Sequence, residues 1–323
     1  MRAAVLRSYG GPEAVAVQDV AEPDVGPGEV LIDVYFAGVV FPDLLMTKGA
    51  YQLKPPLPFI PGWEVAGVVR HDSGRFRAGD RVAAMPLVGG FAESVAVSEH
   101  RVFLLPRDFS LRDAAAVPLN YLTALFALRR RGRLAHGESV LVQGAGGGLG
   151  SACCQLAKAH GARVLAVVSS PEKAAIALKA GADEVLEARD FLAQARLATG
   201  GAGVDMVVDP VGGDRFADSL RSLGPEGRIL VLGFTGRSIP EVKVNRLLLT
   251  NTAVVGVGWE EFAVADPSWV GRQWAELLPL LASGDIRPLI GQVLALEQAP
   301  AALELLDSRG AIGRVLVQVR SCG

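Results

Sequence analysis

The chain has few of the residues that build disulfides or metal sites. It contains 3 cysteines and 4 histidines among 323 residues. The cysteines form no Cys-x-x-Cys pair, and no histidine has the spacing of a metal-ligand motif. These absences argue against a disulfide framework and against a zinc site. A Gly-x-Ser-x-Gly elbow is also missing, which argues against a serine hydrolase of that type. We interpret the cysteines as packing residues: Cys153, Cys154 and Cys322.

The chain also lacks an excess of charge and a long apolar run. Its formal net charge is −2, so it offers no basic field for nucleic acid or an anionic membrane. We interpret the basic stretch Arg129–Arg133 as a solvated helix end. No segment of about eighteen apolar residues is free of polar interruption, and Met1–Val5 indicates a strand instead of a signal sequence. We therefore expect a cytoplasmic protein without nucleic-acid or membrane partners.

The chain does contain enough hydrophobic sequence for two folded domains. Hydrophobic residues make up 50% of it, and a chain of this length usually divides. In the N-terminal third, short apolar runs alternate with Pro and Gly. These runs predict the strands of a compact β-rich domain: Glu29–Phe36, Glu64–Arg70, Asp80–Met85 and Phe91–Val97.

A helix-forming stretch, Ala114–Arg130, leads into a second region in which strand and helix patterns alternate. That alternation predicts an α/β fold with a doubly wound parallel sheet. Near the C-terminus, Arg314–Val319 predicts a strand that we expect to close on the N-terminal sheet. We therefore divide the chain into 1–120, 121–260 and 261–323, and the third part returns to the first domain. The other expected elements are the strands Ser139–Val142, Val164–Val168, Val204–Asp209, Arg228–Gly233 and Ala253–Val257 and the helices Glu172–Ala180, Arg215–Leu223, Trp269–Ser283 and Gln298–Ser308.

A glycine-rich turn follows the first strand of the second region and opens a helix. Its spacing is Ala145-x-Gly147-x-x-Gly150, within a strand, turn, helix and strand unit. The missing side chain at Gly147 lets the backbone approach a pyrophosphate, and Gly150 lets the helix pack closely on the strand. Free N–H groups of the first helical turn then face an anion. The segment therefore predicts a dinucleotide site formed by Ala145, Gly147, Gly148 and Leu149.

The end of the next strand decides which dinucleotide is bound. A free ribose hydroxyl usually meets an acidic residue roughly twenty residues after the glycines, but Ser169, Ser170 and Lys173 stand there. Hydroxyls and a cation suit a 2′-phosphate, so we expect NADPH in preference to NADH. Ser170 is equally suited to cap a helix that begins at Pro171, and the two roles are compatible. Glu172 argues against the preference for NADPH, because a nearby acid weakens the binding of the 2′-phosphate.

Motifs along nearly the whole chain resemble one family, the zinc-independent medium-chain dehydrogenase/reductases of the quinone oxidoreductase and zeta-crystallin branch. The resemblance implies a Rossmann domain that binds NADPH and a GroES-like catalytic domain built from the N- and C-terminal segments. It also implies a homodimer, in which we expect the apolar strand Ala253–Trp259 to pair across a two-fold axis. The motifs are the glycine-rich signature from Gly137 to Lys158 and the stretches Gly10–Glu13, Phe41–Leu45, Pro61–Gly67 and Asn120–Thr123.

The chain departs from the zinc alcohol dehydrogenases that this family resembles. Their catalytic cysteine corresponds to Val40 and their zinc-binding histidine to Trp63, and neither side chain can bind zinc. Asp43 and Glu64 are retained, and we expect them to make local hydrogen bonds. Without a metal to stabilise a localised negative charge, the acceptor has to spread the charge itself, as quinones and enones do. We therefore expect metal-independent hydride transfer from NADPH in the cleft between the domains, helped by one or two hydrogen-bond donors.

The resemblance also suggests further site residues. Tyr51 is the candidate donor to the acceptor, although packing on the neighbouring prolines explains it equally well. Thr123 matches a hydroxyl beside the nicotinamide, with a hydrogen bond to the preceding helical turn as the alternative. Arg189 is a candidate phosphate partner, and Phe234 is a candidate contact of the cofactor.

Three functions remain open on the sequence alone. The first is an NADPH-dependent quinone oxidoreductase whose partner is a small-molecule quinone. The second is an NADPH-dependent enoyl reductase that acts on enones or acyl-CoA thioesters. The third, from another class, is a crystallin-like or RNA-binding protein without catalysis, although the near-neutral charge argues against RNA. The resemblance favours the first.

Overall fold

The computed structural model describes residues 1–321, so Cys322 lies outside the described residues. The chain forms two compact units. Unit 1 consists of residues 1–119, residues 267–282 and the described part of 290–323, and unit 2 consists of residues 120–266 and 283–289. This division differs from the sequence boundaries, because 261–266 and 283–289 group with unit 2. Within the described residues, no helix combines the length and the apolar character needed to span a membrane.

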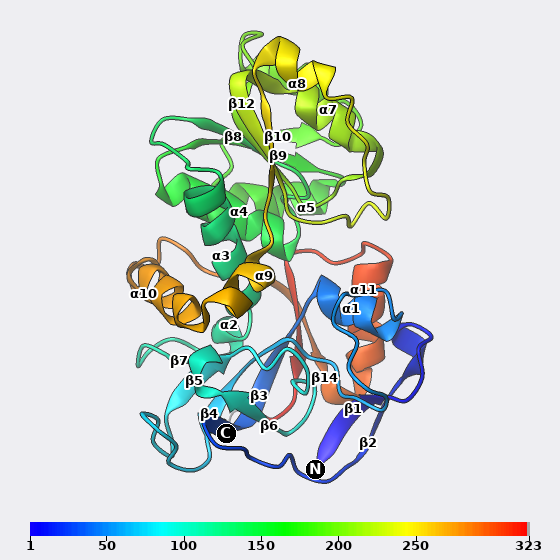
Figure 1. Cartoon of the computed structure of the whole chain (residues 1–323), viewed down its shortest axis with the longest axis vertical. Helices are drawn as coiled ribbons and strands as arrows, with labels where there is room; N and C mark the ends of the chain where they lie inside the picture. Colours follow the sequence, from blue (N-terminus) through cyan, green and yellow to red (C-terminus); the bar gives the residue numbers. More distant parts are fainter. Residues whose placement is uncertain (322–323) are drawn as a thin grey trace. The chain divides into compact units, whose positions relative to one another are not determined.

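A mostly antiparallel sheet forms the centre of unit 1 (Figure 1). Its strand order is β14-β15-β3-β4-β5-β7, and β6 pairs with β3 beside this path. Val30, Ile32 and Val34 alternate along β3 and are buried, as expected for β-branched residues on the core face of a strand. The strands are β3 (Glu29–Val39), β4 (Glu64–Val69), β5 (Arg81–Ala84), β6 (Ser94–Ser98), β7 (Val102–Leu104), β14 (Ile290–Ala295) and β15 (Arg314–Gln318).

The C-terminal strand β15 lies inside this sheet. It pairs antiparallel with β3, where Val315 faces Val39, and parallel with β14. The predicted return of the C-terminal segment to the N-terminal sheet is therefore confirmed. A separate two-stranded sheet joins β1 (Arg2–Leu6) to β2 (Val15–Asp19). The helices of unit 1 include α1 (Phe41–Thr47), α2 (Leu111–Ala114), α10 (Pro267–Ser283) and α11 (Ala299–Asp307).

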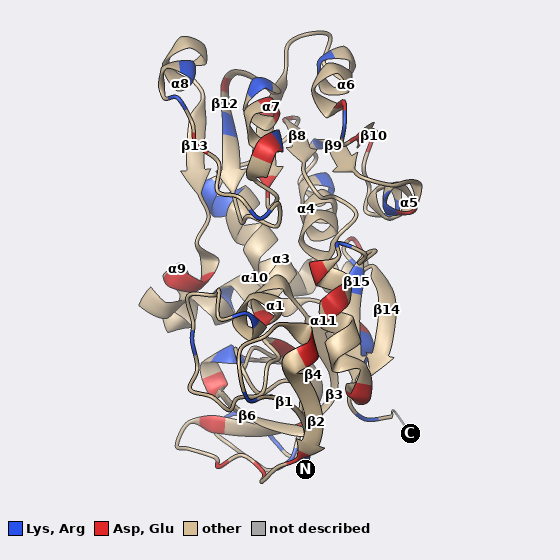
Figure 2. Cartoon of the chain, turned by 90° about the vertical axis from the view of Figure 1, so that its right-hand side faces the viewer, with Lys and Arg blue, Asp and Glu red and all other residues tan. Residues whose placement is uncertain are grey.

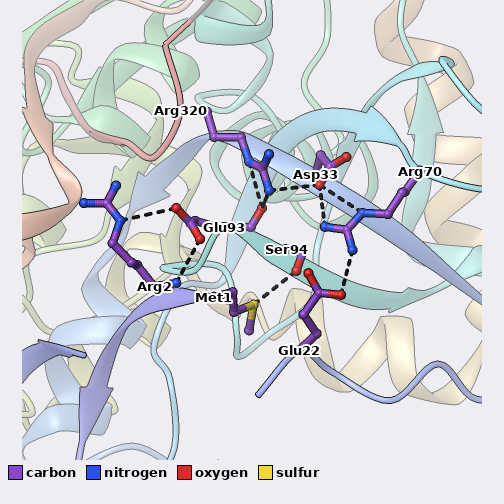
Figure 3. A network of polar contacts seen from close by, with 8 residues as sticks. All are labelled: Met1, Arg2, Glu22, Asp33, Arg70, Glu93, Ser94 and Arg320. Carbon is purple, nitrogen blue, oxygen red and sulfur yellow. Dashed lines mark hydrogen bonds and ion pairs between the residues drawn. The ribbon is translucent and has the colours of Figure 1, made fainter. Parts of the chain in front are cut away.

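Ion pairs connect several segments of unit 1 at its surface (Figure 3). Asp33 in β3 pairs with Arg70 at 2.6 Å and with Arg320 at 3.0 Å. Arg70 also binds Glu22 at 2.9 Å, and Arg320 donates to the main-chain oxygen of Glu93. These groups are partly exposed, so each pair contributes at most about 1 kcal/mol. Their arrangement joins segments from both ends of the sequence.

Unit 2 contains a six-stranded sheet of order β10-β9-β8-β11-β12-β13 in which every neighbouring pair is parallel (Figure 1). The predicted doubly wound sheet is confirmed. The order reverses between β8 and β11, and such sheets bind dinucleotides at the carboxyl ends of the strands where this happens. The strands are β8 (Ser139–Val142), β9 (Arg163–Val168), β10 (Glu184–Glu187), β11 (Val204–Asp209), β12 (Leu223–Val231) and β13 (Ala253–Gly256).

Helices cover this sheet and carry both described cysteines. Cys153 and Cys154 are free, buried thiols in α4, which confirms their packing role. Burial raises the pKa of Cys154 to about 12, so the thiol is unreactive. The helices of unit 2 include α4 (Gly148–Ala159), α5 (Pro171–Lys179), α6 (Phe191–Ala198), α7 (Phe216–Arg221), α8 (Asn245–Thr250) and α9 (Trp259–Ala265).

The expected helix Ala114–Arg130 is divided in the structure. α2 ends at Ala114, α3 spans Pro118–Leu125, and a π-helix follows over Phe126–Arg131. The prediction of one continuous helix was wrong. Pro118 begins α3, and a proline ring is tolerated at the first turn of a helix but not in the interior of a longer one, so the helix starts anew at this residue.

The basic stretch after α3 is exposed, as expected, but its arginines also make defined contacts. The Arg130 guanidinium lies 4.5 Å from the centre of the Phe262 ring in α9. Arg131 donates to the main-chain oxygen of Gly256 at the end of β13, at 2.8 Å. The description of this stretch as a simply solvated helix end therefore needs correction, since two of its side chains bind other elements of unit 2.

Candidate functional site

The glycine-rich turn of unit 2 joins β8 to α4. Gly144 has a φ of 63°, which favours glycine. The N–H of Ala145 donates to the main-chain oxygen of Val167 at 3.1 Å and ties the turn to β9. A Cβ on Gly150 would lie 2.2 Å from the carbonyl oxygen of Gly144. Gly150 therefore permits the close contact of helix and turn that the sequence predicts.

Gly147 leaves open space at the N-terminus of α4. The nearest atom to a Cβ on Gly147 would be the carbonyl oxygen of Gly144, at 3.5 Å. Gly148 and Leu149 are the first residues of this 12-residue helix, and their N–H groups lie in the turn where intrahelical partners are missing. Open space and the partial positive charge of a helix N-terminus together fit a diphosphate.

The start of α5 contains the residues that we expect to distinguish NADPH from NADH. Ser169 is exposed at the end of β9. Ser170 caps α5, because its hydroxyl oxygen accepts the N–H of Lys173 at 3.4 Å. The same hydroxyl group bonds to Glu172 and lowers the pKa of that carboxyl. Lys173 packs on the glycine turn, since a Cβ on Gly146 would lie 2.4 Å from the Lys173 Cβ. The fold thus brings Lys173 to the turn, and the two serines lie directly before the helix that carries it.

Three other candidates for cofactor contact lie elsewhere in unit 2. Arg189 is exposed two residues after the end of β10, and the residue before it donates its N–H to the main-chain oxygen of Val168 at the end of β9. Phe234 follows β12, and a Cβ on Gly212 would lie 2.8 Å from its ring. Arg189 and Phe234 therefore lie near carboxyl ends of the sheet strands. Thr123 is half-buried on α3. Within residues 1–321 its hydroxyl makes no hydrogen bond to the preceding helical turn.

Asp209 is a residue of this region that sequence reasoning missed. It ends β11, where the strand order reverses, and its Oδ1 accepts the N–H groups of Val211 and Gly212 at 2.8 Å each. Burial raises the pKa of Asp209. The residue fixes the loop on which Phe234 packs. An Asp followed by Pro and two glycines after a strand is a turn signal that could have identified it.

In unit 1, Asp43 connects α1 to the turn before β4. It is fully buried, and its two carboxylate oxygens accept the N–H groups of Val40 and Gly62, both at 3.0 Å. Burial raises the pKa of Asp43 to about 7, and the two hydrogen bonds oppose that rise. The local structural role expected for Asp43 is confirmed.

Glu64 opens β4 and joins three segments that are distant in sequence. One carboxylate oxygen forms an ion pair with Arg314 of β15, and the other accepts the N–H of Leu119 at 2.7 Å in the first turn of α3. Arg314 also donates to the main-chain oxygen of Val39 at 3.3 Å. Burial raises the pKa of Glu64, and the charge of Arg314 opposes that rise. Glu64 therefore makes hydrogen bonds within the protein, as expected, but to partners that are distant in sequence.

In the sequence, Trp63 lies between Gly62, which bonds to Asp43, and Glu64. Its ring lies beside the ring of Tyr51. Its side chain is 1% exposed. The rings of Trp63 and Tyr51 are perpendicular, and their centroids are 5.5 Å apart. Tyr51 is half-buried on the loop after α1. A candidate donor and a buried indole therefore occupy the same corner of unit 1, and we call these two residues the Trp63 corner.

The residues of unit 1 that correspond to zinc ligands take no such role here. Among residues 1–321, no group of three or more His, Cys, Asp or Glu side chains is arranged to bind a metal ion. The side chains of Val40 and Trp63 offer no metal-binding atom, and the carboxylates of Asp43 and Glu64 are engaged in internal bonds.

The two units define a class of protein, the medium-chain dehydrogenase/reductases. Residues 26–107 match the family model of the alcohol dehydrogenase GroES-like domain. Residues 148–283 match the model described as zinc-binding dehydrogenase. A GroES-like domain and a Rossmann sheet with a glycine-rich turn are the parts from which this class is built.

Comparison with individual proteins shows which family within this class the chain is similar to. The chain is 38% identical over 325 residues to quinone oxidoreductase-like protein 2 of Rattus norvegicus, covering 99% of this chain and 92% of that protein. Among solved structures, it is similar to a probable oxidoreductase from Mycobacterium abscessus, with 42% identity and a TM-score of 0.90 over 99% of both chains. The quinone oxidoreductase of Thermus thermophilus, solved also as its complex with NADPH, shares 38% identity with a TM-score of 0.87, covering 99% of this chain and 100% of that chain.

The chain therefore belongs to the quinone oxidoreductase family, within the zinc-independent medium-chain dehydrogenase/reductases. The resemblance seen in the sequence and the predicted pair of GroES-like and Rossmann domains are both confirmed.

Proposed function

We propose that the protein is an NADPH-dependent quinone oxidoreductase that transfers a hydride without a metal. One observation carries the proposal: the open glycine turn belongs to a chain that is similar, over 99% of its length, to a quinone oxidoreductase solved with NADPH. When bound, NADPH supplies the hydride from its nicotinamide ring.

The charged groups of NADPH have matching residues in unit 2. The open space at Gly147 and the free N–H groups of α4 suit the diphosphate. Lys173 packs on the same turn and offers a cation for the 2′-phosphate, whereas the Ser170 hydroxyl is already shared with its own helix. We assign the diphosphate to Ala145, Gly147, Gly148 and Leu149, the 2′-phosphate to Ser169, Ser170, Lys173 and Arg189, and other cofactor contacts to Thr123 and Phe234.

The catalytic groups that we propose are the hydroxyls of Tyr51 and Thr123. Hydride addition to a quinone spreads negative charge onto an oxygen, and a hydroxyl donor such as that of Tyr51 stabilises it. The proton that completes the hydroquinone then comes from this hydroxyl or from solvent. Thr123 is proposed on the nicotinamide side, because its hydroxyl is not bound to its own helix within the described residues.

Steady-state assays of the purified protein test this function. We expect NADPH oxidation with phenanthrenequinone or benzoquinone and slower oxidation of NADH. Turnover confined to an alkenal or to crotonyl-CoA would instead assign enoyl reduction. Tight NADPH binding without turnover of any acceptor would support the non-catalytic alternative.

We also propose a homodimer formed along the edge strand β13. This strand and α8 lie at the same edge of the sheet (Figure 2). Five large apolar residues are exposed on and around these elements, namely Ile239, Val244, Leu248, Leu249 and Val254. We expect a dimer by sedimentation, and Leu249→Lys should shift it to a monomer. Leu197→Lys, at an exposed position on α6 of the same unit, is the matched control and should leave the dimer intact.

We further propose that the protein acts on small molecules in the cytoplasm. The two free buried thiols of α4 are compatible with a reducing compartment. Cell fractionation with an antibody to the protein tests the location, and recovery in an oxidising compartment would contradict it.

A further inference from the structure

A cavity of about 350 Å³ lies in unit 2, away from the glycine turn. It is lined by the ends of α4 and α5 and by the segment Ser283–Leu289. The glycine turn lies at the other end of α4, a helix of 12 residues that is about 18 Å long. Cavities of about 300–1,000 Å³ hold small ligands. This cavity is therefore a candidate for a second binding site, separate from the cofactor turn.

Three cationic side chains from three segments line the cavity. They are Lys158 at the end of α4, Lys179 at the end of α5, and Arg287. The whole chain has a net charge of −2, so these cations do not reflect a generally basic surface. Lys179 forms no ion pair within residues 1–321. A concave surface lined by cations concentrates the positive potential and favours an anion.

Two acidic groups near the cavity limit the kind of anion that fits. Asp183 pairs with Lys158 and also accepts the N–H of Val164, so it offsets part of one positive charge. Asp285 lines the cavity itself, and its Oδ2 accepts the Ser283 hydroxyl at 2.6 Å. Asp285 repels a second anionic group and accepts a hydrogen bond from a hydroxyl. A phosphate group joined to hydroxyl groups matches both signs of charge.

The ends of the two helices do not oppose an anion with unpaired carbonyl groups. A helix C-terminus carries a partial negative charge on carbonyls that lack partners. At the end of α4, the N–H groups of Gly161 and Ala162 donate back to the last turn, and those of Gly181 and Ala182 do so at the end of α5. Both glycines have a positive φ, which such caps favour. The charged side chains therefore dominate the field in the cavity.

The wall formed by Ser283–Leu289 is held in place by Gln155 of α4. The Gln155 side chain is 7% exposed. Its Nε2 donates to the main-chain oxygen of Arg287 at 2.8 Å, and its Oε1 accepts the N–H of Arg287 at 2.8 Å and the Tyr121 hydroxyl at 2.9 Å. The bonds between Gln155 and Arg287 use the Arg287 main chain and do not depend on its guanidinium. A wall that is already ordered lowers the entropic cost of binding.

We infer that this cavity binds a small organic phosphate, with the phosphate group at Lys158, Lys179 and Arg287 and a hydroxyl group at Asp285. Hydrogen bonds from lysine and arginine to phosphate are roughly twice as strong as those between neutral groups. A bound ligand joins Ser283–Leu289 to α4 and α5 and stabilises the native protein. The site does not depend on quinone reduction.

Calorimetry with protein saturated with NADP⁺ tests the inference, since the cofactor site is then filled. We expect ribose 5-phosphate to bind at one site, at least about threefold more tightly than inorganic phosphate. Arg287→Met keeps the bonds to Gln155 and should weaken the binding of ribose 5-phosphate about tenfold. Arg196→Met, at an exposed position on α6 outside the cavity, is the matched control and should change the affinity less than about twofold.

Four outcomes would count against the site. Absence of binding at millimolar ribose 5-phosphate would overturn the inference. An equal loss of affinity in Arg287→Met and Arg196→Met would also overturn it, because general surface charge would then attract the ligand. Displacement of ribose 5-phosphate by NADP⁺ would assign the ligand to the cofactor site instead. Equal affinity for inorganic phosphate would overturn the role of Asp285. None of these results depends on whether the protein reduces quinones.

Discussion

The glycine turn of unit 2 and the Trp63 corner of unit 1 are built by different means. The turn consists of main-chain groups from one short segment, residues 144–150, and its key property is empty space beside Gly147. The Trp63 corner depends on buried side chains from distant segments, such as the Glu64 and Arg314 pair with a separation of 250 residues. Main-chain N–H groups are present whatever the side chains are. The turn should therefore fail only when its space is filled, and the corner should fail when one side-chain partner is removed.

The largest expected effect is the loss of one charge of the buried pair. Arg314→Met leaves the Glu64 carboxylate buried without its partner, which should lower the free energy of unfolding by about 3–5 kcal/mol. Denaturant unfolding measures the loss. Lys48→Met is the control, since Lys48 forms a partly exposed pair with Asp307 and should cost no more than about 1 kcal/mol. Equal losses in the two variants would show that the buried pair is not what holds β15 in place.

The second test fills space in the glycine turn. Gly150→Ala puts a Cβ 2.2 Å from a carbonyl oxygen, so it should lower the free energy of unfolding by about 1–3 kcal/mol. Gly147→Ala meets no atom closer than 3.5 Å, so its stability should change by less than about 0.5 kcal/mol. The added methyl should nevertheless weaken NADPH binding at least about tenfold, measured by calorimetry. Unchanged affinity in Gly147→Ala would contradict the assignment of this space to the diphosphate.

The third test concerns Asp43 and pH. Burial raises its pKa from 3.8 to about 7, so the native protein retains a proton that the unfolded chain releases. The resulting stability is complete below about pH 4 and is lost as the pH rises through about 7. Between about pH 5 and pH 7, wild type should lose up to about 2 kcal/mol relative to Asp43→Asn, measured by denaturant unfolding. The comparison cancels the contribution of Glu64, and a stability difference that does not change with pH would show that Asp43 stays ionised.

The smallest expected effect is in cofactor selectivity. Lys173→Ala should weaken NADPH binding about tenfold, or about 1.4 kcal/mol, and leave NADH binding unchanged, because only NADPH carries the 2′-phosphate. Fluorescence titration with each nucleotide measures both constants. Arg196→Ala, at an exposed position on α6, is the control and should affect neither. A parallel loss for both nucleotides would assign Lys173 to the shared diphosphate.

Features encoded by adjacent residues were predicted well from the sequence. The strands Ser139–Val142 and Val204–Asp209 have the predicted bounds. The glycine turn between strand and helix was located as well, since spacing and absent side chains define it. Ser170 was proposed as a helix cap, and it caps α5. Each of these depends on neighbours within a few residues, so short sequence patterns contain the necessary information.

Several features that depend on tertiary contacts were not predicted. β10 is short, has a glutamate at each end and lies at a sheet edge, so no apolar run marks it. The pairing of Glu64 with Arg314 depends on the register of β15 beside β3, which the predicted return of the C-terminal strand to the sheet does not specify. The cavity beside Lys158 and Arg287 became visible only in the folded chain, because its lining comes from three separate segments of the sequence.

The place of Arg314 has a consequence for the order in which the chain folds during synthesis. The ribosome completes residues 120–266 of unit 2 before β15 emerges, so the nucleotide-binding sheet has all of its strands early. Unit 1 is the first to be synthesised but the last to complete its fold. Until β15 is made, the unit 1 sheet lacks an interior strand, and Glu64 lacks its ion-pair partner Arg314. Residues 1–119 therefore cannot form a finished domain alone, and a nascent chain exposes them to chaperones longer than any other part.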